Sequence, residues 1–341
     1  MKMNRIVYRK KGDLSVIEIV SEPSPKPATG EVVVEVHRAG INFADLMMRQ
    51  GLYGAAPDFP FTPGYEVSGI ISEVGAEVEH CEVGQRVIAM TGFGGYAQEV
   101  KVNANRIIPI PDDISFDAAA AMPVTYVTAY HMLAHLGNFQ KGDTILVHHA
   151  AGGVGTAVAQ LAKALGAGIV IGTASDTKRK FVESLGIRFV SRNSEDFVAV
   201  CKEATNGMGV HHALDPVGGK HLMRSYKATR SGGRVYSFGA SSAVSSEKRS
   251  LFAAIKMLRG MPKFDPLRMM NSNKAVFGVH MGMLQDEELM RSHLAALSEM
   301  LANDEISPIV DSVFDYTDVA QAQKYIHDRK NRGKVLLKFK P

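Results

Sequence analysis

The sequence predicts an α/β protein in which a doubly wound parallel sheet is joined to a β-rich region. The first observation is the segment 144–180, TILVHHAAGGVGTAVAQLAKALGAGIVIGTASDTKRK, which has the pattern of strand, glycine turn, amphipathic helix and second strand. The second is that residues 1–120 form short alternating segments separated by glycine and proline, as in antiparallel sheets. The third is that strand and helix patterns alternate after residue 180, which is typical of a parallel sheet covered by helices.

The expected elements follow in chain order. The β-rich region should contain strands at 31–36, 67–74 and 86–90. A helix-rich run begins at Phe116 and crosses Pro123 into the parallel-sheet domain. Apolar runs predict further parallel strands at 187–191, 210–215 and 233–239. The rest of the chain should form a long helix over 289–303 and a last strand over 334–339.

The glycine turn predicts a nucleotide site. Gly152, Gly153 and Gly155 let the backbone turn tightly and approach a diphosphate closely. The helix that starts there, with Val154 as its first apolar residue, directs free N–H groups and the positive end of its dipole at that diphosphate. The spacing is not the strict G-x-G-x-x-G, so the prediction depends on the flanking strands and helix. The alternative is a glycine-rich turn that binds nothing.

The end of the second strand favours NADPH over NADH. Units that bind NAD have an acidic residue about 20 positions after the glycines, but here Thr173 and the residue before it are neutral. Just beyond lie Ser175, Lys178, Arg179 and Lys180, a hydroxyl and three cations suited to a 2′-phosphate. Asp176 would repel that phosphate if it turned inward, and a solvated first helical turn is the alternative use of the basic residues.

Composition restricts the class of protein. The chain has 341 residues, 45% of them hydrophobic, and a net charge of +4 without a long basic block, so nothing indicates nucleic-acid binding. No apolar run approaches the roughly 18 residues of a membrane span, and the amino terminus lacks the apolar core of a signal peptide. We therefore expect a cytoplasmic protein. Cys81 and Cys201 are the only cysteines, too few for a disulfide framework or a cysteine-based zinc site.

Several segments together resemble the medium-chain dehydrogenases/reductases, and among them the zinc-independent quinone oxidoreductase group. They are AGINFADLMMRQGLY (39–53), FTPGYEVSGIISEVG (61–75), VGQRV (83–87), GGYAQE (94–99), HHAAGGVG (148–155) and RKNRGKVLL (329–337). Within that group, NFADLMMRQGLY and the carboxyl-terminal segment are most similar to the vesicle amine transport protein homologues, which are found in synaptic-vesicle membrane preparations.

The resemblance implies a fold and an assembly. A Rossmann domain is expected over 123–267, and a GroES-like catalytic domain over 1–122 and 268–341, with the active site in the cleft between them. The resemblance also suggests a homodimer joined through the Rossmann sheets.

The resemblance also makes one absence informative. Zinc alcohol dehydrogenases of the same superfamily carry a Cys after the first long strand and a His in a G-H-E motif. Here the corresponding segments are Gly40-Ile41-Asn42 and Gly64-Tyr65-Glu66. Without thiolate and imidazole ligands, no zinc ion can polarise an alcohol oxygen, so we expect no catalytic metal.

Other histidines were considered as metal ligands. His131 and His135 lie four apart on a predicted helix, but Met132 replaces the general-base Glu of H-E-x-x-H, and we expect no metal there. The pairs at 148–149 and 211–212 lie in or beside predicted strands, where alternation sends one ring inward and one outward. For these we expect core packing or a hydrogen bond to a neighbour.

By position in the matched motifs, the resemblance assigns cleft roles to Asn42, Asp45, Tyr53 and Tyr65. An Asn amide can hold the ribose or carboxamide, and a phenol can orient or protonate a developing enolate or quinol oxygen. A turn role for Asn42 and a packing role for Tyr53 are the alternatives. Tyr65 takes the place of the lost zinc-ligand His. Further cofactor contacts carried over in this way are Thr128, Asn193, Phe238, Gly239, Phe277, Gly278 and Lys334, with Asn193 in place of a Tyr that often contacts the adenine.

These observations predict an NADPH-dependent reductase. A cleft without zinc stabilises an alkoxide poorly, but it can pass hydride to a quinone or an α,β-unsaturated carbonyl, which spreads the negative charge itself. The alternative is a nucleotide-binding regulatory or membrane-associated protein with little turnover. In that alternative, the segment 251–270, which is apolar with scattered cations, would be the surface that contacts the membrane. Such a segment is more often a lid or a subunit contact.

Overall fold

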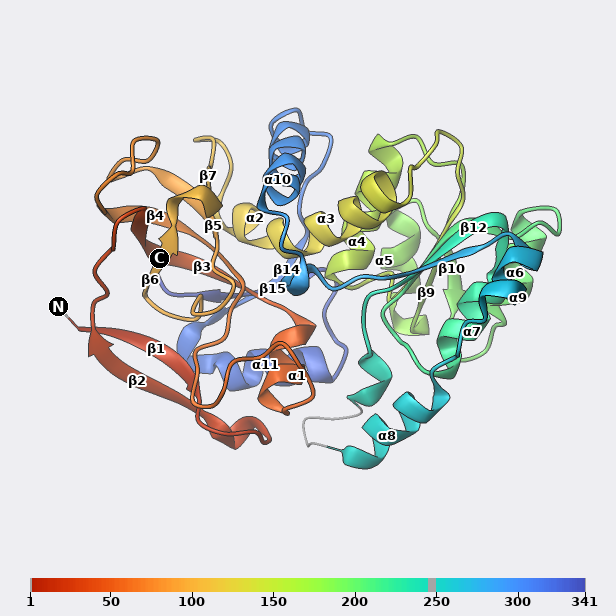
Figure 1. The fold of residues 1–341 in the computed structure, drawn as a ribbon, viewed down its shortest axis with the longest axis horizontal. Helices are drawn as coiled ribbons and strands as arrows, with labels where there is room; N and C mark the ends of the chain where they lie inside the picture. The colour runs from red at the N-terminus through yellow and green to blue at the C-terminus, as the bar shows by residue number, and fades with distance from the viewer. Residues whose placement is uncertain (1, 245–249, 341) are drawn as a thin grey trace.

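The structure is a computed structural model, and it describes residues 2–244 and 250–340. Figure 1 shows two lobes side by side: a β-rich lobe, which holds both marked ends of the chain, and an α/β lobe built from the middle of the chain. Helices α2 (Phe116–Ala121) and α3 (Pro123–Tyr130) lead from the first lobe to the second. The two lobes match the two kinds of sheet that the sequence predicts.

The α/β lobe is organised around a parallel sheet. In the described residues this sheet has six strands in the order β10-β9-β8-β11-β12-β13, so the order reverses between β8 and β11. This is the doubly wound arrangement, in which ligands bind at the carboxyl ends of the strands beside the reversal. The strands are β8 (Ile145–His148), β9 (Val170–Ala174), β10 (Arg188–Ser191), β11 (Val210–Asp215), β12 (Thr229–Ser237) and β13 (Ala275–Gly278).

Helices cover both faces of this sheet. Ile145 and Val147 of β8 belong to a core shared with α3, α4 and α10, whereas Leu146 belongs to a core shared with α6 and α7. All four residues of β8 are buried, as expected for a strand covered on both faces. The helices are α4 (Gly153–Ala164), α5 (Arg179–Ser184), α6 (Phe197–Ala204), α7 (Lys220–Ala228), α8 (Leu251–Gly260), α9 (Pro266–Ser272) and α10 (Glu287–Ala302).

The β-rich lobe contains strands from both ends of the chain. Within the described residues, a mixed sheet has the order β14-β15-β3-β4-β5-β7, and β6 also pairs with β3, while β1 and β2 form a separate pair. The carboxyl-terminal β15 lies between β14 and β3, parallel to the first and antiparallel to the second. The strands are β1 (Lys2–Tyr8), β2 (Ile17–Pro23), β3 (Glu31–Ile41), β4 (Glu66–Val74), β5 (Arg86–Met90), β6 (Glu99–Asn103), β7 (Ile107–Pro109), β14 (Val310–Asp315) and β15 (Lys334–Lys338).

Two further helices, a π-helical turn and several short 3-10 turns connect or cover these strands in the described residues. Helix α1 (Phe43–Arg49) follows β3, and α11 (Val319–His327) packs on β14 and β15. Helix α3 continues directly into a π-helical turn, η3 (His131–Leu136). No helix in residues 2–244 or 250–340 is both long and apolar enough to span a membrane. The short 3-10 turns are η1 (Leu14–Val16), η2 (Ala104–Arg106), η4 (Asp176–Lys178), η5 (Ser241–Ala243), η6 (Met281–Met283) and η7 (Tyr316–Asp318).

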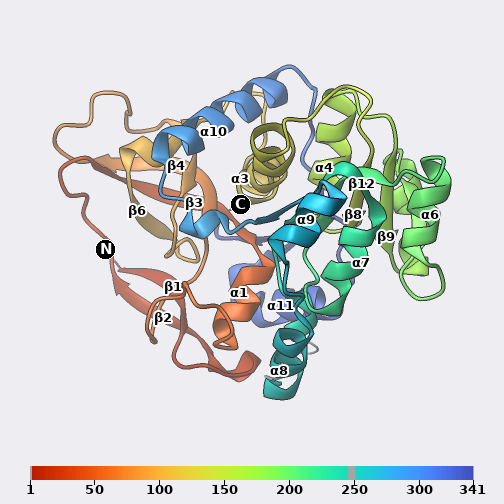
Figure 2. The same ribbon diagram turned by 45° about the vertical axis from the view of Figure 1, so that its right-hand side comes forward.

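The expected domain boundary at residue 267 needs correction. Strand β13 lies beyond it but pairs with β12 in the parallel sheet. Helix α10 packs beside α3, as Figure 2 shows, and its Leu294, Leu297 and Leu301 belong to the core of the α/β lobe. The chain rejoins the mixed sheet only at β14. The sequence did not reveal this because β13 has four residues, none of them fully buried, and therefore no strong apolar pattern.

Candidate active site in the interdomain cleft

A cavity of about 860 Å³ lies between the two lobes and is lined by residues of both. His148, Ala174 and Ser237, which end β8, β9 and β12, all contribute to its wall, as the doubly wound arrangement requires. The sequence-predicted site residues that line it are Asn42, Tyr53, Tyr65, Thr128, Gly152, Gly153, Val154, Gly155, Ser175, Lys178, Phe238, Gly239, Gly278 and Lys334. The predicted residues outside the lining are Asp45, Thr173, Arg179, Asn193 and Phe277.

The glycine turn leaves the first turn of α4 open to the cavity. Gly152 is the N-cap residue of α4 and offers no side chain to the helical N–H groups. A Cβ atom on Gly155 would lie 2.5 Å from the carbonyl oxygens of His149 and Ala150, so only glycine lets the helix pack this closely on the turn. The free N–H groups and the positive end of the helix dipole are therefore suited to binding a diphosphate.

Cations from both lobes surround the predicted 2′-phosphate position. Lys178, Arg192 and Arg329 all line the cavity near Ser175. Burial is the largest effect that lowers the pKa of Lys178 to about 8; Asp311 opposes the shift, while Arg192 and Arg329 add to it. Repulsion among these three cations would be relieved by a bound anion, which favours an anion-binding site here.

His149 lies in the same wall. Its backbone is left-handed, with φ of +55°, and it follows β8 directly. Burial, together with the cations of Arg329 and Arg192, lowers the pKa of His149 to about 4. The imidazole is therefore neutral near pH 7 and adds no positive charge to the anion site.

Four predicted cofactor residues are placed elsewhere, which corrects those assignments. Arg179 stacks over the Phe189 ring at 4.2 Å and lies 3.5 Å from Glu183. Thr173 is buried, and its hydroxyl is 2.8 Å from the His148 ring. In each case the side chain has a partner within the α/β lobe that draws it away from the cleft.

The other two, Asn193 and Phe277, also lie outside the cavity lining. The Asn193 amide donates a 3.3 Å hydrogen bond to Asp176, so both groups turn outside the cavity lining. Asp176 therefore does not turn inward toward the predicted 2′-phosphate position. The Phe277 ring stacks on Tyr236 with centroids 5.5 Å apart, because alternation along β13 sends Phe277 into the core and only Gly278 to the cavity.

A buried polar cluster forms the floor of the cleft. The Lys334 ammonium donates to Asn42 Oδ1 at 2.7 Å and to Glu66 Oε1 at 2.5 Å, and the Asn42 amide donates to the same Glu66 oxygen at 2.8 Å. The second Glu66 oxygen accepts the backbone N–H of Val124 at 2.6 Å, which ties the start of α3 to the cluster. An ammonium group has three N–H donors, so Lys334 keeps one for the cavity that it lines.

Asp45 supports the cleft instead of lining it, which corrects its predicted catalytic contact. It is fully buried, and Oδ2 accepts the backbone N–H of Asn42 and the hydroxyl of Tyr96, both at 2.8 Å. Burial raises the pKa of Asp45 to about 6, partly offset by these hydrogen bonds. The carboxyl group thus fixes the start of α1 and, through it, the position of Asn42.

Two phenols occupy the opposite, apolar part of the cavity. The Tyr53 ring lies 5.0 Å from the His280 ring, and the Tyr65 ring lies 5.4 Å from Phe93. Burial raises the pKa of both phenols, so they stay protonated near neutral pH and can donate a hydrogen bond. Apolar side chains complete this part of the wall: Met47, Leu52, Phe93, Met281, Leu284 and Met290.

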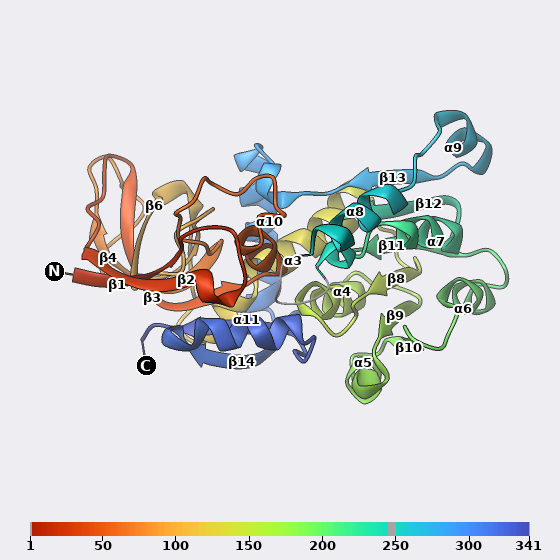
Figure 3. The same cartoon turned by 90° about the horizontal axis from the view of Figure 1, so that it is seen from below.

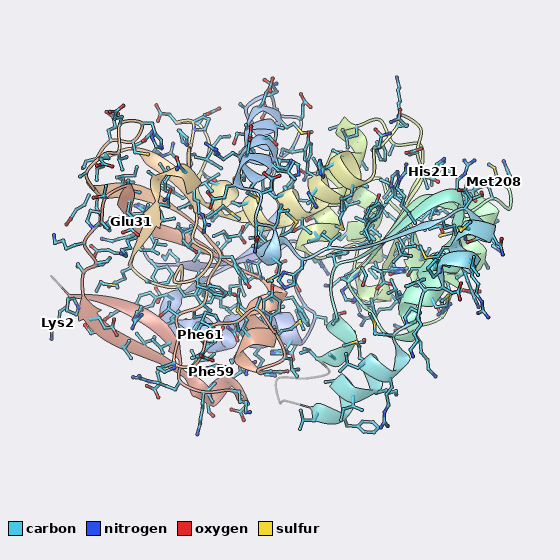
Figure 4. The ribbon with its side chains drawn as sticks, viewed as in Figure 1. Lys2, Glu31, Phe59, Phe61, Met208 and His211 are labelled. Carbon is cyan, nitrogen blue, oxygen red and sulfur yellow. The ribbon has the colours of Figure 1, made fainter. Side chains whose placement is uncertain are left out.

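The histidine pairs behave largely as expected, with hydrogen-bonded rings inside the lobe. His148 contacts Thr173 and, at 3.1 Å, the Ser225 hydroxyl. His212 contacts Asp143 at 2.9 Å. Figure 4 shows His211 at the end of the α/β lobe farthest from the β-rich lobe, away from the cleft.

One set of potential metal ligands adjoins the cavity. Donor atoms of His148, Asp215 and His221 lie within 4.8 Å of one another. They are already used in hydrogen bonds: Asp215 accepts from Ser225 at 2.6 Å and contacts His221 at 2.9 Å, and its other oxygen accepts backbone N–H groups of the following turn. The set therefore acts as a network that fixes the ends of β8 and β11.

Sequence reasoning missed two cations, Arg192 and Arg329. Arg192 follows β10 directly, so a search of each strand end in the parallel sheet would have found it. Arg329 begins the segment RKNRGK just before β15, and it reaches the nucleotide site because Gly333 donates a 2.9 Å hydrogen bond to Ala151 in the glycine turn. The contact between Gly333 and Ala151 joins segments that are far apart in the sequence, so it is evident only in the structure.

Comparison with known proteins identifies the family of this fold. The model of the alcohol dehydrogenase GroES-like domain matches residues 28–112, and that of the zinc-binding dehydrogenase family matches residues 153–299. The synaptic vesicle membrane protein VAT-1 homolog of Homo sapiens is 35% identical over 330 residues, 96% of this chain and 84% of that protein. A probable quinone oxidoreductase of Schizosaccharomyces pombe is 29% identical over 96% of this chain and 94% of that protein.

Solved structures give the same result. The human VAT-1 homolog-like protein superposes with a TM-score of 0.86 and 31% identity, covering 99% of this chain and 98% of that one. The Escherichia coli quinone oxidoreductase complexed with NADPH gives 0.85 and 29%, covering 98% and 99%. The chain thus belongs to the medium-chain dehydrogenase/reductase family of oxidoreductases, in its quinone oxidoreductase group, which includes the VAT-1 homologues. The fold predicted from the sequence, a Rossmann domain with a GroES-like domain, is confirmed.

Proposed function

We propose that this protein is an NADPH-dependent reductase of quinones or α,β-unsaturated carbonyl compounds. The observation that carries the proposal is one continuous cavity that joins the open turn of α4 and its cations to an apolar pocket with two protonated phenols. NADPH, when bound, supplies the hydride.

The residues present suit NADPH. The N–H groups at the start of α4 would hold the diphosphate, and Lys178, Arg192 and Arg329 would hold the 2′-phosphate. The remaining N–H of Lys334 would donate a hydrogen bond to the ribose or carboxamide of the cofactor. Asn42 would hold the ammonium group in place for this contact. In this proposal Asn42 acts mainly through Lys334, which refines the direct contact expected from the sequence.

The proposed acceptor follows from the absence of zinc ligands in the sequence. Asn42 and Tyr65 stand where zinc-dependent relatives have Cys and His, so no Lewis acid is provided at this point for an alcohol oxygen. Quinones and enones delocalise the charge left by hydride addition. Tyr53 would orient the acceptor oxygen and donate a hydrogen bond to it as that charge develops.

Steady-state NADPH oxidation tests the proposal. Simple quinones and enones of increasing apolar size should be reduced, with primary alcohols and NADP⁺ giving no comparable rate. An oxidoreductase that instead oxidises alcohols, or binds NADPH without oxidising it in the presence of any acceptor, would contradict it.

The second candidate function is a nucleotide-binding regulatory or membrane-associated protein with little turnover. The observation that favours it is the exposed apolar side of α8, where Phe252 is 77% and Leu258 is 64% exposed, beside the cations of Lys256 and Arg259. Figure 3 shows α8 and α9 on the outside of the α/β lobe. Sedimentation with anionic vesicles, compared between the unmodified protein and Phe252→Ser, separates this function from a soluble reductase.

We also propose a homodimer joined through the parallel sheets. Strand β13 is at the edge of that sheet, and its backbone groups on the outer side could pair with a second copy. In that arrangement the exposed side of α8 could lie near the partner. Sedimentation equilibrium should give twice the mass of the chain, and a purely monomeric protein would contradict the proposal.

A further inference from the structure

Three histidines from two helices meet on the outer side of the cleft wall. His131 and His135 lie on the π-helical turn that extends α3, and His293 lies on α10. The Nδ1 atom of His131 is 3.0 Å from Nε2 of His293. The three ring centroids are 5.1, 5.3 and 5.5 Å apart, so the rings form a nearly equilateral triangle.

This spacing matches that of three imidazoles on one metal ion. A tetrahedral zinc ion lies about 2.0–2.1 Å from each ring nitrogen, which places the centroids of its imidazole ligands about 5 Å apart. To bind the ion, each ring would rotate about its side-chain bonds until one nitrogen faced the metal. The rings would not need to move closer together. His135 is exposed, so its ring has room to rotate. The third histidine, His293, lies 158 positions further along the chain, and the sequence did not indicate that it would lie beside the other two.

We propose that His131, His135 and His293 bind a zinc ion, with water as the fourth ligand. This site is distinct from the position of the lost catalytic zinc and goes beyond the proposed reductase activity. The protein would supply the three neutral imidazoles that zinc accepts, from the helical i, i+4 pair and from the facing helix.

The surroundings favour an ion over a simple hydrogen-bonded cluster. In the described part of the chain, neither ring nitrogen of His135 has a hydrogen-bond partner, and His131 and His293 share only the contact with each other. In the set around His148, by contrast, both ring nitrogens of His148 and both carboxylate oxygens of Asp215 have hydrogen-bond partners.

A bound ion would fix one wall of the cavity. Helix α10 contributes Met290, Arg291 and Leu294 to the lining, and α3 contributes Val127 and Thr128. The two helices pack side by side, and zinc would hold them together at the histidine triangle. Its role is to stabilise the arrangement of α10 over the cleft, without contact with the acceptor.

The test is titration of the full chain with Zn²⁺ after removal of metal by dialysis against a chelator. Calorimetry should show one strong site per chain, Co²⁺ should give the visible absorption of a tetrahedral complex, and Zn²⁺ should raise Tm. His135→Ala should weaken Zn²⁺ binding at least tenfold and abolish the rise in Tm. Because His135 is exposed, this variant keeps the fold, which circular dichroism checks.

Two matched variants locate the site. His80→Ala, at another exposed histidine, and His221→Ala, in the set beside the cavity, should leave Zn²⁺ affinity within twofold of the unmodified protein. Absence of Zn²⁺ binding, equal affinity in His135→Ala, or loss of affinity in His221→Ala alone would each overturn the proposal.

Discussion

The ammonium group of Lys178 donates a hydrogen bond to the backbone carbonyl of Asn331, a residue 153 positions further along the chain and in the other lobe. Lys178 follows β9 in the α/β lobe, whereas Asn331 lies in the loop just before β15. The same loop carries Arg329 into the cavity. The proposed phosphate site is therefore assembled from both lobes, and its cofactor preference depends on their contact.

We expect Lys178→Ala to weaken NADPH binding by about 1.5–3 kcal/mol, since a charged hydrogen bond to the 2′-phosphate is lost, and to leave NADH almost unchanged. The matched control is Arg179→Ala, because Arg179 lies beside Glu183 and outside the cavity lining. Dissociation constants from fluorescence titration measure both effects. Equal affinities for NADPH and NADH in the unmodified protein would exclude the proposed preference.

The preference for NADPH should also depend on pH. Lys178 has a pKa of about 8 and binds phosphate in its protonated form, so above this pH the free protein must take up a proton to bind NADPH. The NADPH dissociation constant should therefore rise as the pH increases from 8 to 10, up to about tenfold per unit, while that of NADH should not. Lys178→Arg stays protonated and should remove this dependence.

Stability should depend on the ionisation of Asp45. Its pKa is raised to about 6 in the folded protein from 3.8, so the folded state binds the proton more tightly, and stability falls as the pH rises through this interval. The unfolding free energy should be about 2.4 kcal/mol higher at pH 4 than at pH 7. Asn at this position cannot titrate. Urea unfolding of Asp45→Asn should therefore give a smaller difference in unfolding free energy between pH 4 and pH 7 than urea unfolding of the unmodified protein.

The two cleft residues Asn42 and Tyr53 should differ in their effects. Tyr53→Phe should lower kcat/KM about tenfold, or about 1.4 kcal/mol, with little change in Tm, because Tyr53 lines the cavity and the change keeps its ring. Asn42→Ala should lower Tm as well, because Lys334 and Glu66 lose a shared partner in a buried cluster. Normal turnover by Tyr53→Phe with a lowered Tm would show that this phenol has only a packing role.

Chelation should separate catalysis from the proposed zinc site. The proposed hydride transfer uses no zinc, because the family resemblance puts Tyr65 at the position of a zinc-ligand His, so kcat measured well below Tm should survive exhaustive chelation. The Tm itself should fall because α10 loses its link to α3. If zinc and kcat are instead lost together and return together, the metal takes part in the reaction.

The sequence predicted regular, strongly patterned parts of the molecule well and long-range contacts poorly. The strands around the glycine turn and the helix at 289–303 were evident because each has a clear apolar period. Strand β13 lacks such a period. Arg179 was expected at the phosphate because it is close in sequence, whereas Phe189 and Glu183 hold it elsewhere, and Arg329 arrives from the far end of the chain.

The same distinction applies to the cleft residues. Asn42 and Lys334, which were chosen by motif position, both line the cavity, but the motifs did not reveal their mutual hydrogen bond or the contact of both with Glu66. Asp45 was grouped with them because it lies in the same motif, although its side chain turns under α1 to Tyr96. Side-chain direction within a short helix depends on tertiary packing, which local sequence does not encode.

The position of β15 between β14 and β3 has a consequence for biosynthesis. During translation, β3 and β4 leave the ribosome early, but their sheet lacks an inner member until residues 334–338 have been made. The parallel sheet needs nothing from that late segment, so it can fold first. Residues 38–41 of β3 pair with β15 and therefore lack this partner strand while nearly 300 residues are added, a period in which a chaperone would protect them from aggregation.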